Sequence, residues 1–191
     1  GGQATTQGVP LDEHPWIEQY GRNQSYADFR NGVRNYYRSY YPLSYAAQRD
    51  THLNPGAAWV TSLGYEPKVG MAVLYQMLAP HTTSGKVIIL TRHKPVAVET
   101  RGDIFTSVVF EDLLQNVRRQ ISAKFILDAT ELGDLLELGK VEYVIGAEPQ
   151  SETQEPNAYG EGDPLRQQPF THLIACDYLP DEDHSIAKPK D

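Results

Sequence analysis

The feature of this sequence that most constrains its fold is a series of β-type segments in the middle of the chain. Residues 86–91 (KVIILT) and 123–129 (AKFILDA) are short, strongly apolar runs of the kind found in buried strands. Between them, residues 95–100 and 104–110 flank a tight turn, and the polar residues 115–119 form another turn or a short strand. This order predicts a three-stranded β-meander inserted as a crossover between two strands of a parallel sheet.

Two helices are predicted before this β region. From Ser25, the predicted N-cap, to Tyr41, apolar and aromatic side chains recur at three- and four-residue spacing, and Pro42 stops the pattern. A second helix is predicted from Pro67, which suits a first turn, to Pro80, which would end it. The elements predicted downstream are a short helix at 132–138 closed by Gly139, a strand at 141–145, a polar loop or lid at 150–168 and a strand at 170–178.

Charge and composition exclude several classes of function. The 25 acidic residues outnumber the 17 basic ones, so the net charge of -8 would repel a nucleic acid. No run approaches the roughly 20 apolar residues that a membrane span needs, and we expect no membrane partner. The single cysteine, Cys176, excludes an internal disulfide and a multi-cysteine metal site. The histidines show no metal-ligand spacing with one another, and we expect no metal.

Six segments that span most of the chain resemble a known family. They are residues 1–9 (GGQATTQGV), 12–18 (DEHPWIE), 54–60 (NPGAAWV), 125–136 (FILDATELGDLL), 141–148 (VEYVIGAE) and 153–158 (TQEPNA). In this order they are similar to the bacterial FAD-dependent oxidoreductases related to the glutathione-reductase-like flavoproteins. The resemblance implies FAD as cofactor and an α/β fold: part of a Rossmann-like FAD-binding domain with an inserted β-meander, plus part of a mixed substrate-side region. The implied parts are a flavin-loop segment with a helical substrate-side region at 1–83, FAD-domain strands with the meander at 84–146, and an acidic loop with a substrate-side strand at 147–191.

The resemblance also implies which residues bind the cofactor. The loop beside the flavin would consist of Gly1, Gly2, Gln3, Ala4 and Thr5. Glycines suit such a loop because the backbone can approach a flat ring with no Cβ in the way. An ordinary flexible terminus is the alternative for these residues. Pro95 and Val96 would run past the adenine ring, and a plain strand is the alternative there.

A second cofactor segment is residues 128–134 (DATELGD), a strand end and tight turn that would come near FAD. Ala129 and Thr130 are small enough for a close approach, and Gly133 permits an unusual backbone angle. Glu131 stands where many flavoproteins have glycine. Its carboxylate would be repelled by a phosphate, so we do not predict it as a ligand.

In such an enzyme the flavin would carry out the redox chemistry, and the protein would orient a small organic substrate, supply protons and exclude water. His14 is the candidate catalytic residue, because imidazole exchanges protons near neutral pH and His14 lies in one of the six segments. A hydrogen-bonded structural role is the alternative, and it applies more strongly to His172. Cys176 follows an apolar run and is interpreted as a buried, inert thiol. The tyrosines between residues 36 and 45 are interpreted as packing against a core.

No GxGxxG loop occurs in the sequence, so the phosphate-binding loop of such a fold would precede Gly1. We therefore expect an internal fragment of an enzyme that transfers a hydride between a small organic substrate and flavin. The alternative is a stand-alone, non-enzymatic binding or interaction domain that has lost cofactor binding. A carbohydrate-active protein is a third and weaker interpretation, since no pair of carboxylates stands out. The sequence predicts neither the oligomeric state nor the compartment.

Overall fold

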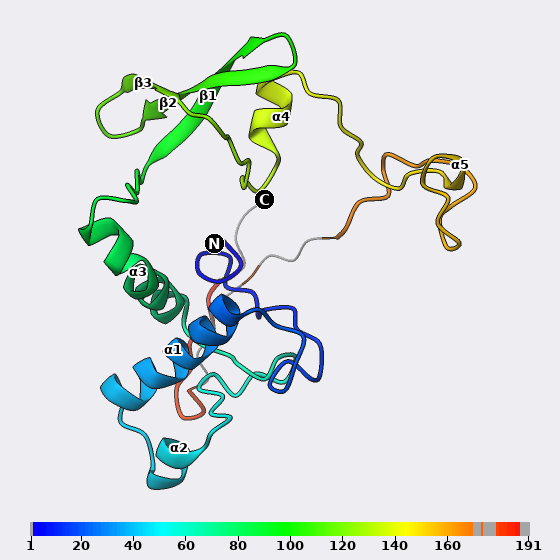
Figure 1. Ribbon diagram of the computed structural model, residues 1–191. Helices are drawn as coiled ribbons and strands as arrows, with labels where there is room; N and C mark the ends of the chain where they lie inside the picture. Colours follow the sequence, from blue (N-terminus) through cyan, green and yellow to red (C-terminus); the bar gives the residue numbers. More distant parts are fainter. Residues whose placement is uncertain (1, 170–172, 174–178, 188–191) are drawn as a thin grey trace.

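The computed structural model describes residues 2–169, 173 and 179–187 of the chain. Its elements are α1 (Gln24–Tyr40), α2 (Tyr45–Arg49), α3 (Pro67–Thr83), β1 (His93–Arg101), β2 (Ile104–Asp112), β3 (Val117–Ser122), α4 (Asp134–Leu138) and α5 (Gln150–Thr153). Figure 1 shows α1 and α3 near the N-terminal loop, α2 farther away beyond α1, and the sheet with α4 on the other side of that loop. This mixture of helices and a three-stranded antiparallel sheet is consistent with the predicted α/β class.

Helix α1 forms where its apolar spacing predicts it, but Asn23 caps it and not Ser25. The Asn23 side chain accepts a hydrogen bond from the Tyr26 amide at 2.8 Å, which satisfies one of the free donors of the first turn. The prediction of Ser25 as N-cap is therefore wrong, because Ser25 already lies within the first turn. The helix ends before Pro42, as predicted, with Tyr41 in an extended conformation.

Helix α3 begins at Pro67, which confirms the predicted start. It does not end at Pro80, because the helix continues to Thr83 with Pro80 inside it. A proline lacks an amide hydrogen, so the carbonyl four residues earlier has no helical donor from position 80, yet the helix continues for one short turn beyond it.

The hydrophobic core lies between α1 and α3. Its buried side chains are Phe29, Val33, Tyr37, Leu53, Leu63, Val69 and Val73. Burying each large apolar side chain stabilises the fold by roughly 1.5–3 kcal/mol. Gly32 lets the helices approach closely, since a Cβ there would lie 2.6 Å from Cγ1 of Val73. The predicted packing of the tyrosines is confirmed for Tyr36, Tyr37 and Tyr41, whereas Tyr40 and Tyr45 are exposed.

The predicted β-meander is confirmed. Strands β1, β2 and β3 form one antiparallel sheet in sequence order, with Val98 paired to Val108 and Val108 to Ile121. The turn between β1 and β2 contains Gly102 at a φ of +61°, a conformation that glycine adopts without strain. The third strand starts and ends later than the segment 115–119 predicts.

The strands predicted on either side of the meander are not strands among the described residues. Residues 86–91, 123–129 and 141–145 take no place in the sheet, and Ile88 and Leu127 are 80% and 90% exposed. An apolar run becomes a buried strand only when neighbouring strands satisfy its amides and carbonyls, and no described segment does so. The Rossmann-like part of the predicted fold is therefore not confirmed.

The remaining predictions concern the C-terminal third. Helix α4 is confirmed with Gly139 at its C-terminal end, although it begins two residues later than predicted, after Gly133, and it packs on β1. Residues 150–168 are mostly irregular, as predicted, with α5 as a single turn near their start. Bridges from Ala147 to Asp163 and from Pro149 to Tyr159 close this segment on itself. The strand predicted at 170–178 and Cys176 lie outside the described residues, except for Leu173.

Candidate functional site

The N-terminal loop is held in one conformation by hydrogen bonds and close packing. The Gly2 carbonyl accepts hydrogen bonds from the Thr5 and Gln7 amides, both at 3.0 Å. The Tyr65 hydroxyl donates to the Ala4 carbonyl at 3.1 Å. Helix α3 packs closely against the same carbonyl at Gly70. A Cβ at this position would lie only 2.3 Å from the Ala4 oxygen. These residues are therefore an ordered part of the fold and not a flexible terminus. Gly1 lies outside the described residues.

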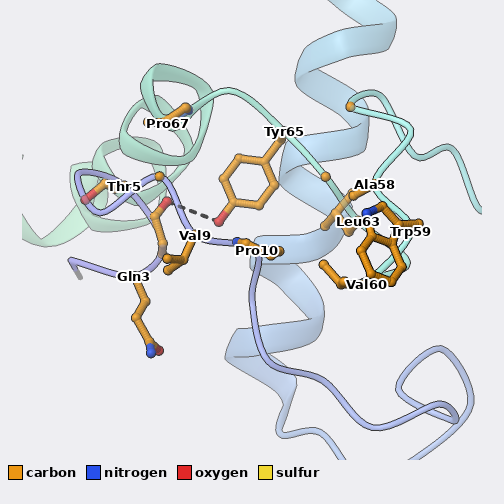
Figure 2. A pocket seen from close by; sticks show the side chains of 14 residues that line it. Gln3, Thr5, Val9, Pro10, Ala58, Trp59, Val60, Leu63, Tyr65 and Pro67 are labelled. Carbon is orange, nitrogen blue, oxygen red and sulfur yellow. Dashed lines mark hydrogen bonds between the residues drawn. The ribbon is translucent and has the colours of Figure 1, made fainter. Parts of the chain in front are cut away.

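A cavity of about 640 Å³ lies between this loop and residues 56–67. Its lining residues are Gln3, Ala4, Thr5, Gly8, Val9, Pro10, Gly56, Ala58, Trp59, Val60, Leu63, Gly64, Tyr65 and Pro67. Figure 2 shows Tyr65 and Pro10 in the middle of this lining, with Trp59 and Val60 at one end and Pro67 at the other. No residue of this lining carries a charged side chain. Its size is that of a small-molecule site, and its neutrality favours an uncharged ligand or part of one.

The wall that carries Trp59 is a closed loop with a fixed base. The Asn54 side chain donates to the Ala58 carbonyl at 2.8 Å and accepts from the Gly64 amide at 2.7 Å. The Gly56 amide donates to the Gly64 carbonyl at 2.8 Å. A Cβ on Gly56 would lie 3.0 Å from the Gly64 carbonyl carbon, so the two sides of the loop nearly touch. This is the structural role of the NPGAAWV segment.

Charged residues of the DEHPWIE segment anchor the same wall from behind. Glu13 forms an ion pair with Arg30, and its other carboxylate oxygen accepts a hydrogen bond from the Thr61 hydroxyl at 2.9 Å. Arg30 also forms an ion pair with Glu18 and donates to the Ser62 hydroxyl at 2.9 Å. Thr61 and Ser62 directly follow the cavity-lining residue Val60, so this buried cluster fixes the wall in place.

Glu18 of this cluster and the nearby Tyr65 have shifted pKa values. Burial alone would raise the pKa of Glu18, but the hydrogen bond from Arg34 and the charges of Arg30 and Arg34 outweigh it and lower the pKa to about 2. Burial, followed by the negative charge of Glu13, raises the pKa of Tyr65 to about 12. The Tyr65 phenol therefore stays protonated and can donate to the Ala4 carbonyl at neutral pH.

The turn at 128–134 meets the N-terminal loop, although the two are far apart in sequence. The Gln7 side chain donates to the Glu131 carboxylate at 2.7 Å, and a Cβ on Gly2 would lie 2.3 Å from its other oxygen. A second cavity of about 320 Å³ is lined by Gly2, Gln3, Ala4, Leu11 and Glu131. The two segments predicted to lie near a cofactor are thus brought together through Glu131, the residue that was not predicted as a ligand.

Within this turn, backbone groups are satisfied locally. Asp128 accepts hydrogen bonds from the Thr130 amide at 2.9 Å and the Leu135 amide at 3.0 Å. The Thr130 amide is the main cause of the lowered pKa of Asp128. The Thr130 hydroxyl accepts from the Asp134 amide at 2.8 Å, and Gly133 has a φ of +68°, the left-handed conformation that glycine permits. Ala129 is exposed.

A third cavity, of about 330 Å³, opens between α1 and α3 on another side of the loop. Its lining residues are Ala4, Asn23, Ser25, Tyr26, Phe29, Leu74 and Met77. Ala4 is common to all three cavities. The short N-terminal loop is therefore the place where these three cavities adjoin.

Other predicted site residues lie elsewhere. The His14 imidazole lies over Gly21 and packs against Trp16 and Tyr20, with ring centroids 6.3 and 6.1 Å away. His14 lines none of the three cavities. Pro95 and Val96 lie in β1, outside all three linings. The cofactor roles predicted for Pro95 and Val96, and the catalytic role of His14, stay predictions.

Two properties of the described residues concern metals and membranes. Nowhere in that part of the chain do three or more His, Cys, Asp or Glu side chains gather as a metal site would require. Among its helices, none combines the length and the apolar character that a bilayer span needs.

Sequence reasoning missed Trp59 and Tyr65 as cavity residues and Glu13 and Arg30 as their support. A signal for the ion pairs was present, because Glu13 and Glu18 precede a helix that carries Arg30 and Arg34 four residues apart on one face. For Trp59 and Tyr65 the sequence offers only their position in and near the NPGAAWV segment.

Comparison with known proteins identifies the family. The family of FAD dependent oxidoreductases matches residues 1–188, which is nearly the whole chain. No curated protein and no solved structure matches it significantly. The match covers the N-terminal loop, the Trp59 loop and the turn at 128–134, the three segments around Ala4. The chain belongs to the FAD dependent oxidoreductase family, and its cofactor is accordingly FAD.

Proposed function

We propose that this protein is an FAD-dependent oxidoreductase that transfers a hydride between a small organic substrate and the flavin, with the flavin ring beside the N-terminal loop. One observation carries the proposal. The loop around Ala4 is fixed in place and stands at the meeting point of three cavities, the largest of which is neutral and of ligand size. The loop residues Gly2, Gln3, Ala4 and Thr5 would hold the ring.

The residues around the loop fit the ring of FAD but not its diphosphate. A flavin ring is flat and uncharged, as the neutral walls of the largest cavity require. A diphosphate needs cationic side chains or free amides, and the only charged residue in the three linings is Glu131. Its carboxylate would repel phosphate. The diphosphate is therefore proposed to bind outside these three cavities.

The finer parts of the fold follow from the same proposal. Residues 86–91, 123–129 and 141–145 are apolar, and they flank the meander or follow α4. We propose that they pair as strands of a Rossmann-like sheet, with Ala129, Thr130 and Gly133 at a strand end near the cofactor. Such pairing would need partner strands from outside the described residues, and it would cover the exposed side chains of Ile88 and Leu127.

The chemistry divides between cofactor and protein. Bound FAD supplies the two-electron acceptor or donor. The walls of the cavity between the loop and residues 56–67 would orient flat groups, and Tyr65 holds the loop through its hydrogen bond to Ala4. His14 is the proposed acid or base. Because it lines none of the cavities, this role requires the substrate to extend to the loop that contains Trp16 and Tyr20.

The substitution Ala4→Leu tests the proposal, because Ala4 lines all three cavities and a larger side chain there would reduce the space beside the loop. In protein purified from cells, we expect the flavin content of the variant to be at least tenfold lower than that of the wild type. Flavin content is measured from visible absorption after removal of free FAD. Ala79→Leu is the matched control, since Ala79 is exposed on α3 and lines none of the cavities. Circular dichroism of both variants shows whether the fold is kept.

Two results would overturn the proposal. One is a folded Ala4→Leu variant that retains its flavin. The other is a wild-type protein that stays colourless with excess FAD, which would favour a non-enzymatic binding domain. If flavin is bound, anaerobic bleaching of its absorption band by candidate reductants identifies the substrate class.

A further inference from the structure

The Trp59 side chain is 94% exposed, which is more than that of Trp16, the other tryptophan, at 54%. Tryptophan carries a large apolar surface and is normally well buried, so this exposure leaves a large area in water. The residue lies on the lining of the largest cavity, next to Val60 (Figure 2). Covering its ring would be a favourable contribution to the binding of any apolar ligand.

The position of Trp59 is fixed by the structure on both sides of it. Asn54 bridges the Ala58 carbonyl and the Gly64 amide, which closes the loop at its base. Thr61 is bonded to the buried carboxylate of Glu13. The backbone on either side of Trp59 is thus restrained, and the exposed indole is available at the cavity without contributing to the core. This arrangement lowers the entropy cost of using it to bind a ligand.

We propose that Trp59 covers a flat, uncharged aromatic ring bound in the cavity of about 640 Å³ between the N-terminal loop and residues 56–67, and that it is the residue that selects for such a ring. Indole rings stack on flat rings, and the absence of charged side chains from the lining disfavours an ionic ligand. The ring belongs either to the flavin or to an aromatic substrate. This inference deepens the proposed function. The flavin as occupant rests on that proposal, whereas the ring site itself does not.

The protein has only two tryptophans, which makes the test specific. Each indole N–H gives one resonance in a ¹⁵N-correlated NMR spectrum, and Trp16→Phe and Trp59→Phe assign the two. Riboflavin, which has the flavin ring without the phosphates, and 2-naphthol, a flat ring that is not a flavin, are titrated separately into flavin-free protein. We expect the Trp59 resonance to shift and the Trp16 resonance to stay, because ring-current effects act only at short range.

Affinity provides the second measurement. Trp59→Leu keeps an apolar residue but removes the stacking ring, and we expect it to weaken ring binding about tenfold. Trp59→Phe should recover part of the loss. Trp16→Leu replaces the other exposed tryptophan, which lines no described cavity, and should bind like the wild type.

The outcomes separate the two possible sources of the ring. A shift of Trp59 with riboflavin alone, or with both probes, supports the inference with the flavin as occupant. A shift with 2-naphthol alone supports it with an aromatic substrate as occupant and contradicts the proposed position of the flavin. If neither probe moves Trp59, or if Trp59→Leu binds the probes like the wild type, the inference is wrong. That result does not contradict the proposed function if the wild-type protein still retains the absorption band of FAD.

Discussion

The carboxylate of Glu13 forms an ion pair with the guanidinium of Arg30, and each side chain is only 2% exposed. Two charges at this depth are stable only together, because each compensates the loss of water around the other. Glu13 accepts a hydrogen bond from the Thr61 hydroxyl, and Arg30 donates one to the Ser62 hydroxyl. Thr61 and Ser62 belong to the loop that carries Trp59. A single buried ion pair therefore connects the stability of the fold to the shape of the candidate site.

Removing one partner of this pair is expected to be strongly destabilising. Glu13→Gln leaves the Arg30 guanidinium buried with less compensating charge, and we expect a loss of about 3 kcal/mol in the free energy of unfolding, measured with urea. Lys68→Ala is the control, because it removes the exposed ion pair with Glu66 and should change stability little. Equal effects of the two substitutions would contradict the burial of the Glu13–Arg30 pair.

The lowered pKa of Glu18 predicts a dependence of stability on pH. The ordinary pKa of 4.5 applies to the unfolded chain, and the folded protein has about 2. The unfolded state therefore takes up the proton first as the pH falls, and the contribution of Glu18 is complete above 4.5 and is lost between 4.5 and about 2. The difference in free energy of unfolding between wild type and Glu18→Gln should shrink through this window. The other carboxylates are common to both proteins and cancel, so a difference that is constant with pH would contradict the prediction.

The sequence predicts those elements whose stability is local. Helices α1 and α3, the β-meander and α4 follow from side-chain periodicity, turn residues and capping, which act within a few residues of each other. The segment 86–91 shows the limit, because an apolar run specifies burial but not the partner that provides it. Pro80 shows another, since the helix continues past a proline that the local rule would place at its end.

Less of the candidate site could be predicted from the sequence, because its residues come together only through contacts between distant segments. The close approach at the N-terminal loop follows from the residue types Gly2 to Thr5, but its partner Gly70 is identified only when α3 is folded against it. Glu131 was not predicted as a ligand because of its charge, and in the fold its carboxylate accepts a hydrogen bond from the Gln7 side chain. Trp59 is a cavity residue because Asn54 and Gly64 close a loop, which is a tertiary arrangement with no periodic signal.

Gly70 provides a direct test of the packing behind the loop. In Gly70→Ala the new Cβ would lie 2.3 Å from the Ala4 carbonyl oxygen and 2.6 Å from the Tyr65 ring, so the loop must move. We expect a lower melting temperature, corresponding to a loss of about 1–3 kcal/mol in the free energy of unfolding. This loss outweighs the higher helix propensity of alanine relative to glycine. Flavin binding should weaken with it. Gly160→Ala is the matched control, because nothing lies within 4 Å of its added Cβ, and its melting temperature should not change. A stable Gly70→Ala variant with normal flavin content would contradict the fixed loop.

The proposed role of His14 is tested by separating turnover from structure. Its imidazole nitrogen Nε2 would lie 2.3 Å from a Cβ on Gly21, so Gly21→Ala must displace the ring, and the φ of +80° adds strain. If His14 transfers protons to or from the substrate, His14→Gln should lower kcat by about 100-fold or more while flavin content and KM stay near wild type. Gly21→Ala should lower kcat in the same direction, and His52→Gln, at an exposed site, should not. An unchanged kcat for His14→Gln together with a lower melting temperature would instead assign the ring to packing against Trp16 and Tyr20, because only a stacked, non-catalytic imidazole affects stability without affecting turnover.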